Sequence, residues 1–225
     1  MKNLIIIFLL ISFYSNAQKS DKKDEKNKSY NSIINNEVTT DDGLFKVHKK
    51  GDDYYYEIHP SLLEKEMLMV TRIAKTANGI GYGGQKINSQ VLRWQKKTNK
   101  ILLRIVSYEN IALDSLPIYE SVRNSNFEPI LYSFDIETYN PKDSSVLINI
   151  AALFNTDVKA LGFPQFRRKN LKITSLDKKR SFIESIKSFP KNIEVRNVLT
   201  YISSDPPSTR NSQTISLEIN NSMIL

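Results

Sequence analysis

The sequence contains no cysteine, and its only histidines are His48 and His59. The lack of cysteine excludes disulfides, thiolate zinc sites and catalysis by a thiol nucleophile. Many exported proteins rely on disulfides, but a chain of 225 residues can bury enough apolar surface to fold without them. The same lack excludes a lipid anchor attached to a cysteine.

The two histidines do not have the spacing of a zinc hydrolase. Such enzymes commonly place two histidines one helical turn apart, with a glutamate between them as the base. His48 and His59 are eleven residues apart, and we expect both to be ordinary strand or surface residues. The sequence also has no Gly-x-Ser-x-Gly elbow for a serine nucleophile. We therefore expect no catalytic residue, no metal ligand and no cofactor in this chain.

A carboxylate pair is the remaining candidate for a catalytic group. Asp135 and Glu137 are two residues apart in an expected strand, so their side chains share one face. This spacing is too common to indicate catalysis by itself. A hydrolase that uses carboxylates alone therefore stays an alternative to the two non-catalytic functions given below, because a sequence does not place carboxylates in space.

The first residues have the pattern of an export signal. Lys2 precedes an apolar run over residues 4–13, and small residues at 15–17 predict cleavage after Ala17. A membrane anchor is the alternative, but about ten apolar residues are too few for a span that needs about twenty. Residues 18–29 are polar and predict a flexible tether. We expect an exported protein, periplasmic or extracellular, without an integral membrane segment after cleavage.

Alternating apolar residues and turn formers then predict a mainly β fold. Hairpins are expected over residues 44–58, 91–108 and 129–154, with further strands at 67–73, 193–202 and 214–219. One helix is expected near residues 176–189, because Phe182, Ile183, Ile186 and Phe189 have helical spacing before Pro190. The fold class is mainly β (α+β), with antiparallel hairpins in a sandwich or a barrel-like sheet. The single tryptophan, Trp94, is expected in the core.

Two segments could contact a partner. The formal charge is +8, and the dense basic block lies within residues 167–180. A solvated loop and helix start explains this block, and an exported protein has little occasion to meet nucleic acid, which we do not expect as a partner. The glycine-rich segment 79–84 lacks the Gly-Lys-Ser/Thr ending of a phosphate loop and predicts a mobile loop. The candidate contact residues are Gly81, Tyr82, Gly83, Gly84, Arg167 and Arg168.

Several segments together resemble the two amino-terminal, non-catalytic modules of large exported zinc-dependent metalloproteases of the metzincin-like type. The resemblance covers nearly everything after the tether, and its segments keep the family's order. They are residues 43–49, 55–58, 63–75, 81–85, 91–94, 125–131, 134–137, 177–181, 189–195 and 220–225. The resemblance implies a first module at residues 30–80 and a second, β-rich module at 81–225. The apolar end at 223–225 favours a second module that is incomplete at this end.

The resemblance implies what the chain does. The family's His-Glu-x-x-His helix is absent here, so zinc is expected only in a protease domain outside this sequence. The chain would be a scaffold, a prosegment-like cover or a recognition platform for its own protease domain or for a separate protease chain. The alternative is a free-standing exported β-module that binds peptide, glycan or envelope material, with the tyrosines at 54–56 as further contacts. A fragment, a split gene and a true short paralogue all fit the sequence.

Overall fold

A computed structural model describes residues 29–207 and 212–225 of the chain. The expected signal peptide at residues 1–17, and the tether up to residue 28, lie outside the described residues. Within those residues, twelve strands form one sheet in which every pairing is antiparallel. The mainly β, antiparallel fold class is therefore confirmed.

The strands are β1 (Thr39–Asp41), β2 (Lys46–Lys50), β3 (Asp53–Ile58), β4 (Glu66–Lys75), β5 (Lys86–Lys97), β6 (Lys100–Val106), β7 (Ile130–Tyr139), β8 (Val146–Asn149), β9 (Ile173–Leu176), β10 (Phe182–Phe189), β11 (Asn192–Ser203) and β12 (Thr214–Ile224). The α-helices are α1 (Tyr30–Ile33), α2 (Tyr119–Ser125), α3 (Ala151–Asn155) and α4 (Gln165–Asn170). Short 3₁₀ turns are η1 (Pro60–Leu62), η2 (Lys159–Leu161) and η3 (Lys178–Arg180).

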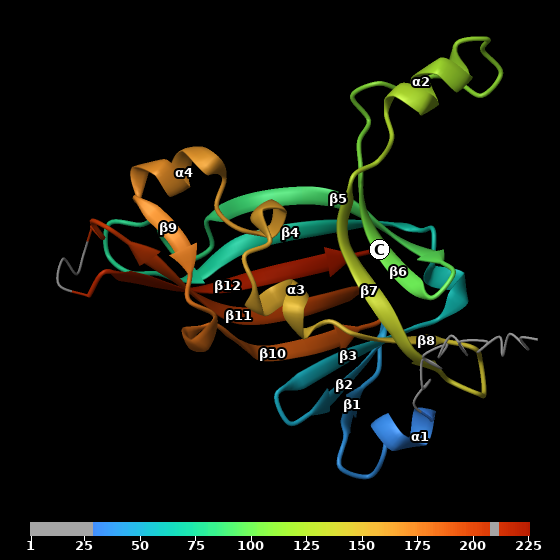
Figure 1. Ribbon diagram of the computed structural model, residues 1–225, viewed down its shortest axis with the longest axis horizontal. Helices are drawn as coiled ribbons and strands as arrows, with labels where there is room; N and C mark the ends of the chain where they lie inside the picture. The colour runs from blue at the N-terminus through green and yellow to red at the C-terminus, as the bar shows by residue number, and fades with distance from the viewer. Residues whose placement is uncertain (1–28, 208–211) are drawn as a thin grey trace, which may run out of the picture.

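The sheet is curved until its two ends meet. Its strand order is β1-β2-β3-β8-β7-β6-β5-β4-β12-β11-β10, and β9 pairs with β11 (Figure 1). Where the end strands approach, Leu44 N donates to Phe189 O at 2.7 Å and Ser188 Oγ donates to Phe45 O at 2.7 Å. Gly43 makes this approach possible, because a Cβ there would lie 2.6 Å from Ser188 Oγ and 2.7 Å from the backbone of Phe189. The sheet is nearly closed and barrel-like.

Strands from both expected modules alternate around this sheet. β3 of the first segment lies beside β8 of the second, and β4 lies between β5 and β12. Residues 29–76 therefore cannot complete their sheet without the later strands. Both segments form one continuous β body.

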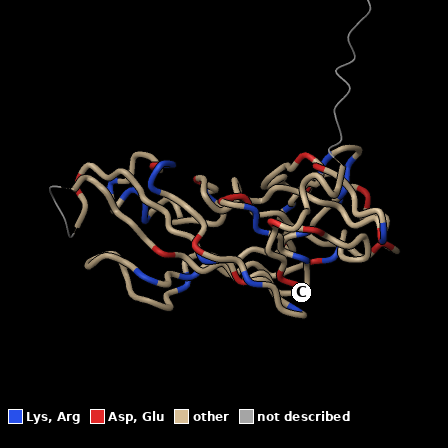
Figure 2. Tube along the Cα trace, turned by 90° about the horizontal axis from the view of Figure 1, so that it is seen from below, with Lys and Arg blue, Asp and Glu red and all other residues tan. Residues whose placement is uncertain are grey.

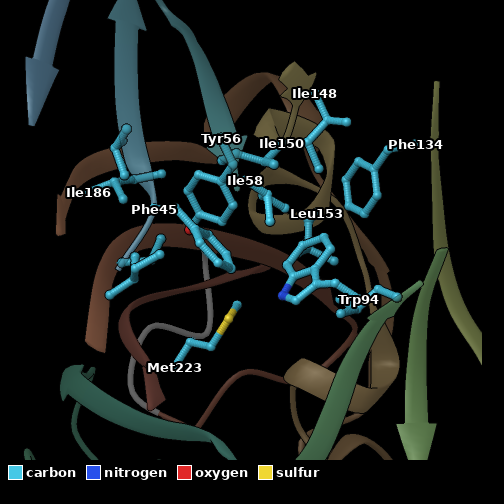
Figure 3. Close-up of a cluster of buried hydrophobic side chains, with 14 of the residues drawn as sticks. Phe45, Tyr56, Ile58, Trp94, Phe134, Ile148, Ile150, Leu153, Ile186 and Met223 are labelled. Carbon is cyan, nitrogen blue, oxygen red and sulfur yellow. The ribbon is translucent and has the colours of Figure 1, made fainter. Parts of the chain in front are cut away.

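The main core fills the space that the curved sheet encloses. Trp94 is fully buried, as expected, and its ring centroid lies 5.9 Å from that of Phe45 and 5.6 Å from that of Phe134 (Figure 3). Figure 3 also shows Tyr56 beside Phe45, at a centroid distance of 5.4 Å. A second, smaller cluster includes Ile80, Phe163 and Tyr201. The apolar alternation of the strands supplies both clusters.

The prediction of a helix near residues 176–189 is wrong. Residues 178–180 form the turn η3, and residues 182–189 form β10, which pairs with β11. A bulge between Ile183 and Ser185 inserts one residue, so Ile183 and Ile186 point to the same side at a spacing of three. The bulged strand thus reproduces a helical spacing.

The expected hairpins are present over β2–β3, β5–β6 and β7–β8. The last one is shorter than expected, because the apolar run after Asn149 continues as the helix α3. The side chain of Asn149 starts that turn by accepting a hydrogen bond from Ala151 N at 3.0 Å. Among residues 29–207 and 212–225, no helix is long and apolar enough to cross a lipid bilayer.

Candidate binding site

The most exposed apolar side chains lie on an arm, residues 107–129, that connects β6 to β7. Figure 1 shows this arm projecting away from the sheet, with α2 near its tip. Phe127 is 75 % exposed, Ile111 72 % and Leu113 69 %. Leu116 and Ile118 are also exposed. Several large apolar side chains exposed on one short segment favour an interaction surface.

The arm has no core of its own. None of the seven residues of α2 is buried, and a helix this short is marginally stable in water without packing. A few hydrogen bonds shape it: Asn126 Nδ2 donates to Val122 O at 2.7 Å, and Asn110 Nδ2 donates to Asn126 Oδ1 at 3.0 Å. These bonds fix the course of the backbone but cover none of its apolar side chains.

The base of the arm is attached firmly to the sheet. Ile105 N donates to Pro129 O at 3.0 Å, and Arg104 Nη1 donates to Glu128 O at 2.7 Å. The guanidinium of Arg104 also lies 4.8 Å from the ring centroid of Phe127. The arm therefore leaves the sheet in a defined direction.

A cavity of about 520 Å³ lies between the arm and the outer face of β5 and β6. Four basic side chains and one acidic side chain line it, together with three amides and an aromatic ring. They are Arg93, Gln95, Lys97, Arg104, Arg123, Asn124, Asn126, Phe127 and Glu128.

Positive charge dominates the wall of this cavity. Arg93 and Arg104 occupy directly opposed positions of the β5–β6 ladder, an arrangement that is unfavourable for like charges. Glu128 forms an ion pair with Arg93, and Glu64 Oε2 lies 3.7 Å from Arg93 Nε. Arg104 is 6 % exposed and bonds only neutral groups within the described chain, including Gln95 Oε1 at 2.8 Å. Its charge has no carboxylate partner among residues 29–207 and 212–225.

The sequence did not single out these cavity residues. Arg93 and Arg104 alternate with apolar residues on two strands, which is the ordinary pattern of a half-buried sheet. Only the pairing of β5 with β6 and the return of the arm bring them beside Arg123. The available signal was the long connection between the second and third hairpins, with its isolated apolar residues.

The glycine-rich segment forms a loop between β4 and β5. Gly81 and Gly84 have φ values of 147° and 88°, and a Cβ on Gly81 would lie 2.4 Å from Gln85 Oε1. Gly84 N donates to Ile73 O at 2.7 Å, which ties the loop to β4. Tyr82 is 67 % exposed and is the one large apolar group that this loop presents to solvent. Gly83 allows a close approach to Ala74 O.

Of the two arginines singled out in the basic block, Arg168 is committed to the interior. It is 7 % exposed, its Nη1 donates to Asp157 Oδ2 at 2.9 Å, and its Nε donates to Phe163 O at 2.9 Å. Burial lowers the pKa of the Arg168 guanidinium, but the hydrogen bond and charge of Asp157 and the interaction with Tyr201 together outweigh burial and raise it. Its guanidinium also lies 5.3 Å from the ring of Tyr201. Arg168 therefore fixes the segment before α4 and is not a surface contact.

The rest of the basic block is partly neutralised. Arg167 is half-buried with its guanidinium over the ring of Phe163, at 5.5 Å. Lys172 pairs with Asp205 at 2.6 Å and Arg180 with Asp177 at 2.8 Å. Figure 2 shows basic and acidic positions interspersed along the trace. The structure places α4 and the glycine-rich loop at the same end of the molecule. Phe163, which precedes α4, and Ile80, which lies in the glycine-rich segment, both belong to the second core cluster.

His48 is a buried member of a line of polar groups that begins at the exposed Thr40. Its Nδ1 is 2.8 Å from Thr40 Oγ1 and its Nε2 is 3.0 Å from Glu57 Oε2. A hydroxyl, an imidazole and a carboxylate in line are also the parts of a hydrolytic triad. Here His48 is only 2 % exposed, and both ring nitrogens are occupied by strand neighbours. The line therefore stabilises the first hairpin.

Glu57 is the centre of that network. Tyr30 donates to it at 2.6 Å, Lys46 at 2.9 Å and Asn140 at 2.8 Å, in addition to His48. Burial raises the pKa of the Glu57 carboxyl, but these hydrogen bonds together outweigh it and hold the pKa well below the usual range. The network attaches α1 and the loop after β7 to the first hairpin. His59, by contrast, is exposed and caps η1 by accepting a bond from Ser61 N at 3.2 Å.

The carboxylate pair lies on a second cavity, of about 410 Å³, whose wall includes Asp53, Asp135 and Glu137. The Asp135 side chain is 83 % exposed and pairs with Lys100 at 3.1 Å. A general acid needs apolar surroundings that keep its carboxyl protonated. Asp135 lacks such surroundings, because its side chain is exposed and paired with a lysine. In the part of the chain that the structure describes, no cluster of three or more His, Cys, Asp or Glu side chains could hold a metal ion.

Comparison with known proteins matched two family models. Residues 84–225 match a domain of unknown function, DUF5117, and residues 27–76 match a second one, DUF5118. No curated protein and no solved structure matches the chain. Because the first match covers more than half of the sequence, the chain belongs to the DUF5117 family, preceded by a DUF5118 segment.

Proposed function

We propose that this chain is the non-catalytic amino-terminal region of an exported zinc-dependent metalloprotease. In this account it is a recognition platform or cover for the protease domain, which supplies the zinc and the hydrolytic chemistry. The domain would belong either to the same polypeptide or to a separate chain. The resemblance of ten ordered segments to the family's amino-terminal modules supports this proposal.

The observation that carries the proposal is the projecting arm. Its side chains Ile111, Leu113 and Phe127 are each more than two-thirds exposed, and α2 has no buried residue. A free surface of this kind is costly in water and becomes favourable when a partner covers it. The barrel-like sheet holds the base of the arm, so the arm can present its apolar side chains in a fixed direction (Figure 1).

The proposal is tested first on the gene and then on the protein. The DNA after the codon for Leu225, or a neighbouring gene, should encode a domain with a His-Glu-x-x-His helix. That domain, produced separately, should bind the purified chain, as measured by isothermal titration calorimetry. The chain alone should neither retain zinc after dialysis nor cleave peptides. Tight stoichiometric zinc with proteolysis by the chain alone would contradict the proposal.

The second candidate is a free-standing exported β-module that binds peptide, glycan or envelope material. The exposed Tyr82 on the glycine-rich loop and the basic cavity beneath the arm favour it. Immobilised chain would separate the two accounts. Retention of cell-envelope polysaccharide favours the free-standing module, whereas retention of the protease domain alone favours the platform.

A further inference from the structure

The cavity beneath the arm has more positive charge than the residues that the structure describes neutralise. Of its four basic side chains, Arg93 is paired with Glu128, and Arg123 is paired with Glu120 at 3.2 Å. Lys97 is exposed, and Arg104 is buried without a carboxylate partner in the described chain. A buried cation without a counter-ion costs stability, so its retention favours a ligand that supplies the negative charge.

The geometry suits an anion that enters from the side of the arm. Arg104 already uses Nε for Gln95 and Nη1 for the Glu128 carbonyl, which leaves other guanidinium donors for a ligand. Arg123 and Asn126 on the arm line the same cavity from the opposite side. An incoming carboxylate would thus meet donors from both the sheet and the arm.

The surroundings decide the class of ligand. Phe127 lines the cavity and is 75 % exposed, and Ile111 and Leu113 are exposed elsewhere on the same arm. A sulfated or phosphorylated glycan would satisfy the charge but would leave these side chains in water. A peptide segment in which acidic and apolar residues alternate satisfies both.

We propose that the cavity between the arm and strands β5 and β6 binds an acidic, apolar-containing peptide segment, with a carboxylate of the segment bonded to Arg104. This inference deepens the proposed function and rests on it in one respect, the role of the arm in recognition. It does not depend on which polypeptide carries the segment.

The test uses a short fluorescein-labelled peptide in which Asp alternates with Leu, and a matched peptide with Asn in place of Asp. The fluorescence anisotropy of each labelled peptide is measured as the full mature chain is added. The Asp peptide should bind, and the Asn peptide should bind much more weakly. Affinity should fall as the salt concentration rises above about 0.15 M, because screening weakens partly exposed charge pairs.

Substitutions then locate the site. The variant Arg104→Gln should bind the Asp peptide about ten- to a hundredfold more weakly, because it loses one charge-assisted hydrogen bond. The double variant Lys97→Gln/Arg123→Gln keeps the test valid if Arg104→Gln does not fold, because both of these side chains are exposed. It should also weaken binding. Lys100→Gln is the matched control, since Lys100 is a neighbouring exposed cation outside the cavity, and it should bind as the wild type does.

Equal binding of the Asp and Asn peptides would overturn the inference, as would unchanged affinity in the double variant. Binding of a heparin oligosaccharide at these residues without binding of the Asp peptide would overturn it too. If the protease domain binds the chain while the Asp peptide does not, the inference fails and the proposed function stands. If the peptide binds and the domain does not, the proposed function fails instead.

Discussion

Arg93 and Arg104 face each other across the β5–β6 ladder, although only Arg93 has a carboxylate partner among the described residues. Like charges in opposed positions destabilise a sheet. Such a pair is therefore expected at a binding site, where function and not stability determines which residues are present. The part of the arm that leads back to β7 contributes Arg123 and Phe127 to the cavity beside these two strands. Charge and apolar exposure thus coincide at one place on an otherwise ordinary β surface.

The arm should contribute to binding but not to folding. Ile111→Ala should change the free energy of unfolding by less than about 0.5 kcal/mol, because the side chain is exposed. Ile101→Ala is the matched control, since Ile101 is fully buried, and it should cost about 2–5 kcal/mol. Urea unfolding followed by circular dichroism measures both. A large loss of stability in Ile111→Ala would mean that the arm packs on the body of the protein.

Closure of the sheet should depend on Gly43. Gly43→Ala places a methyl group against the backbone of Phe189 and should destabilise the protein by about 1–3 kcal/mol. Gly51→Asn is the control, because Gly51 has a φ of 59°, which asparagine tolerates, and open space around it. Thermal unfolding should show a lower Tm for Gly43→Ala than for Gly51→Asn. Equal Tm values would contradict closure of the sheet at this contact.

Acid should destabilise the protein through Glu57. Its folded-state pKa lies well below the usual 4.5, so the bonds that it accepts contribute fully above pH 4.5 and are lost as the pH falls below that value. Glu57→Gln should lose about 1–3 kcal/mol at neutral pH and show a smaller further loss on acidification. Urea unfolding over a pH series measures this. Glu120→Gln, an exposed carboxylate on α2, should keep the wild-type pH dependence.

Export should remove the first seventeen residues. The chain expressed in a host with a secretory pathway should appear outside the cytoplasm with Gln18 at its amino terminus, as shown by intact mass and terminal sequencing. Ala17→Arg should block processing, because a signal peptidase reads small residues at this position. Asn16→Ser is the control and should be processed normally. A cytoplasmic chain that retains Met1 would contradict the export proposal.

Most of the sheet could be predicted from local signals, since alternating residues and turn formers define hairpins directly. The segment 182–189 could not, because a bulge between Ile183 and Ser185 imitates helical spacing. The apolar run after Asn149 fits a buried strand as well as it fits a helix, and in the structure it forms α3. The binding cavity depends on strand pairing and on the course of the arm, which a sequence does not display. The same limit hid the burial of Arg168 against Asp157.

Hydrogen exchange of the chain with and without the protease domain tests the central claim most directly. The platform account predicts new protection of backbone amides in the arm, residues 107–129, when the domain is added. The first hairpin, β2 and β3, should exchange as before, since its network around Glu57 is already formed. Protection confined to other surfaces, with the arm unchanged, would contradict the account.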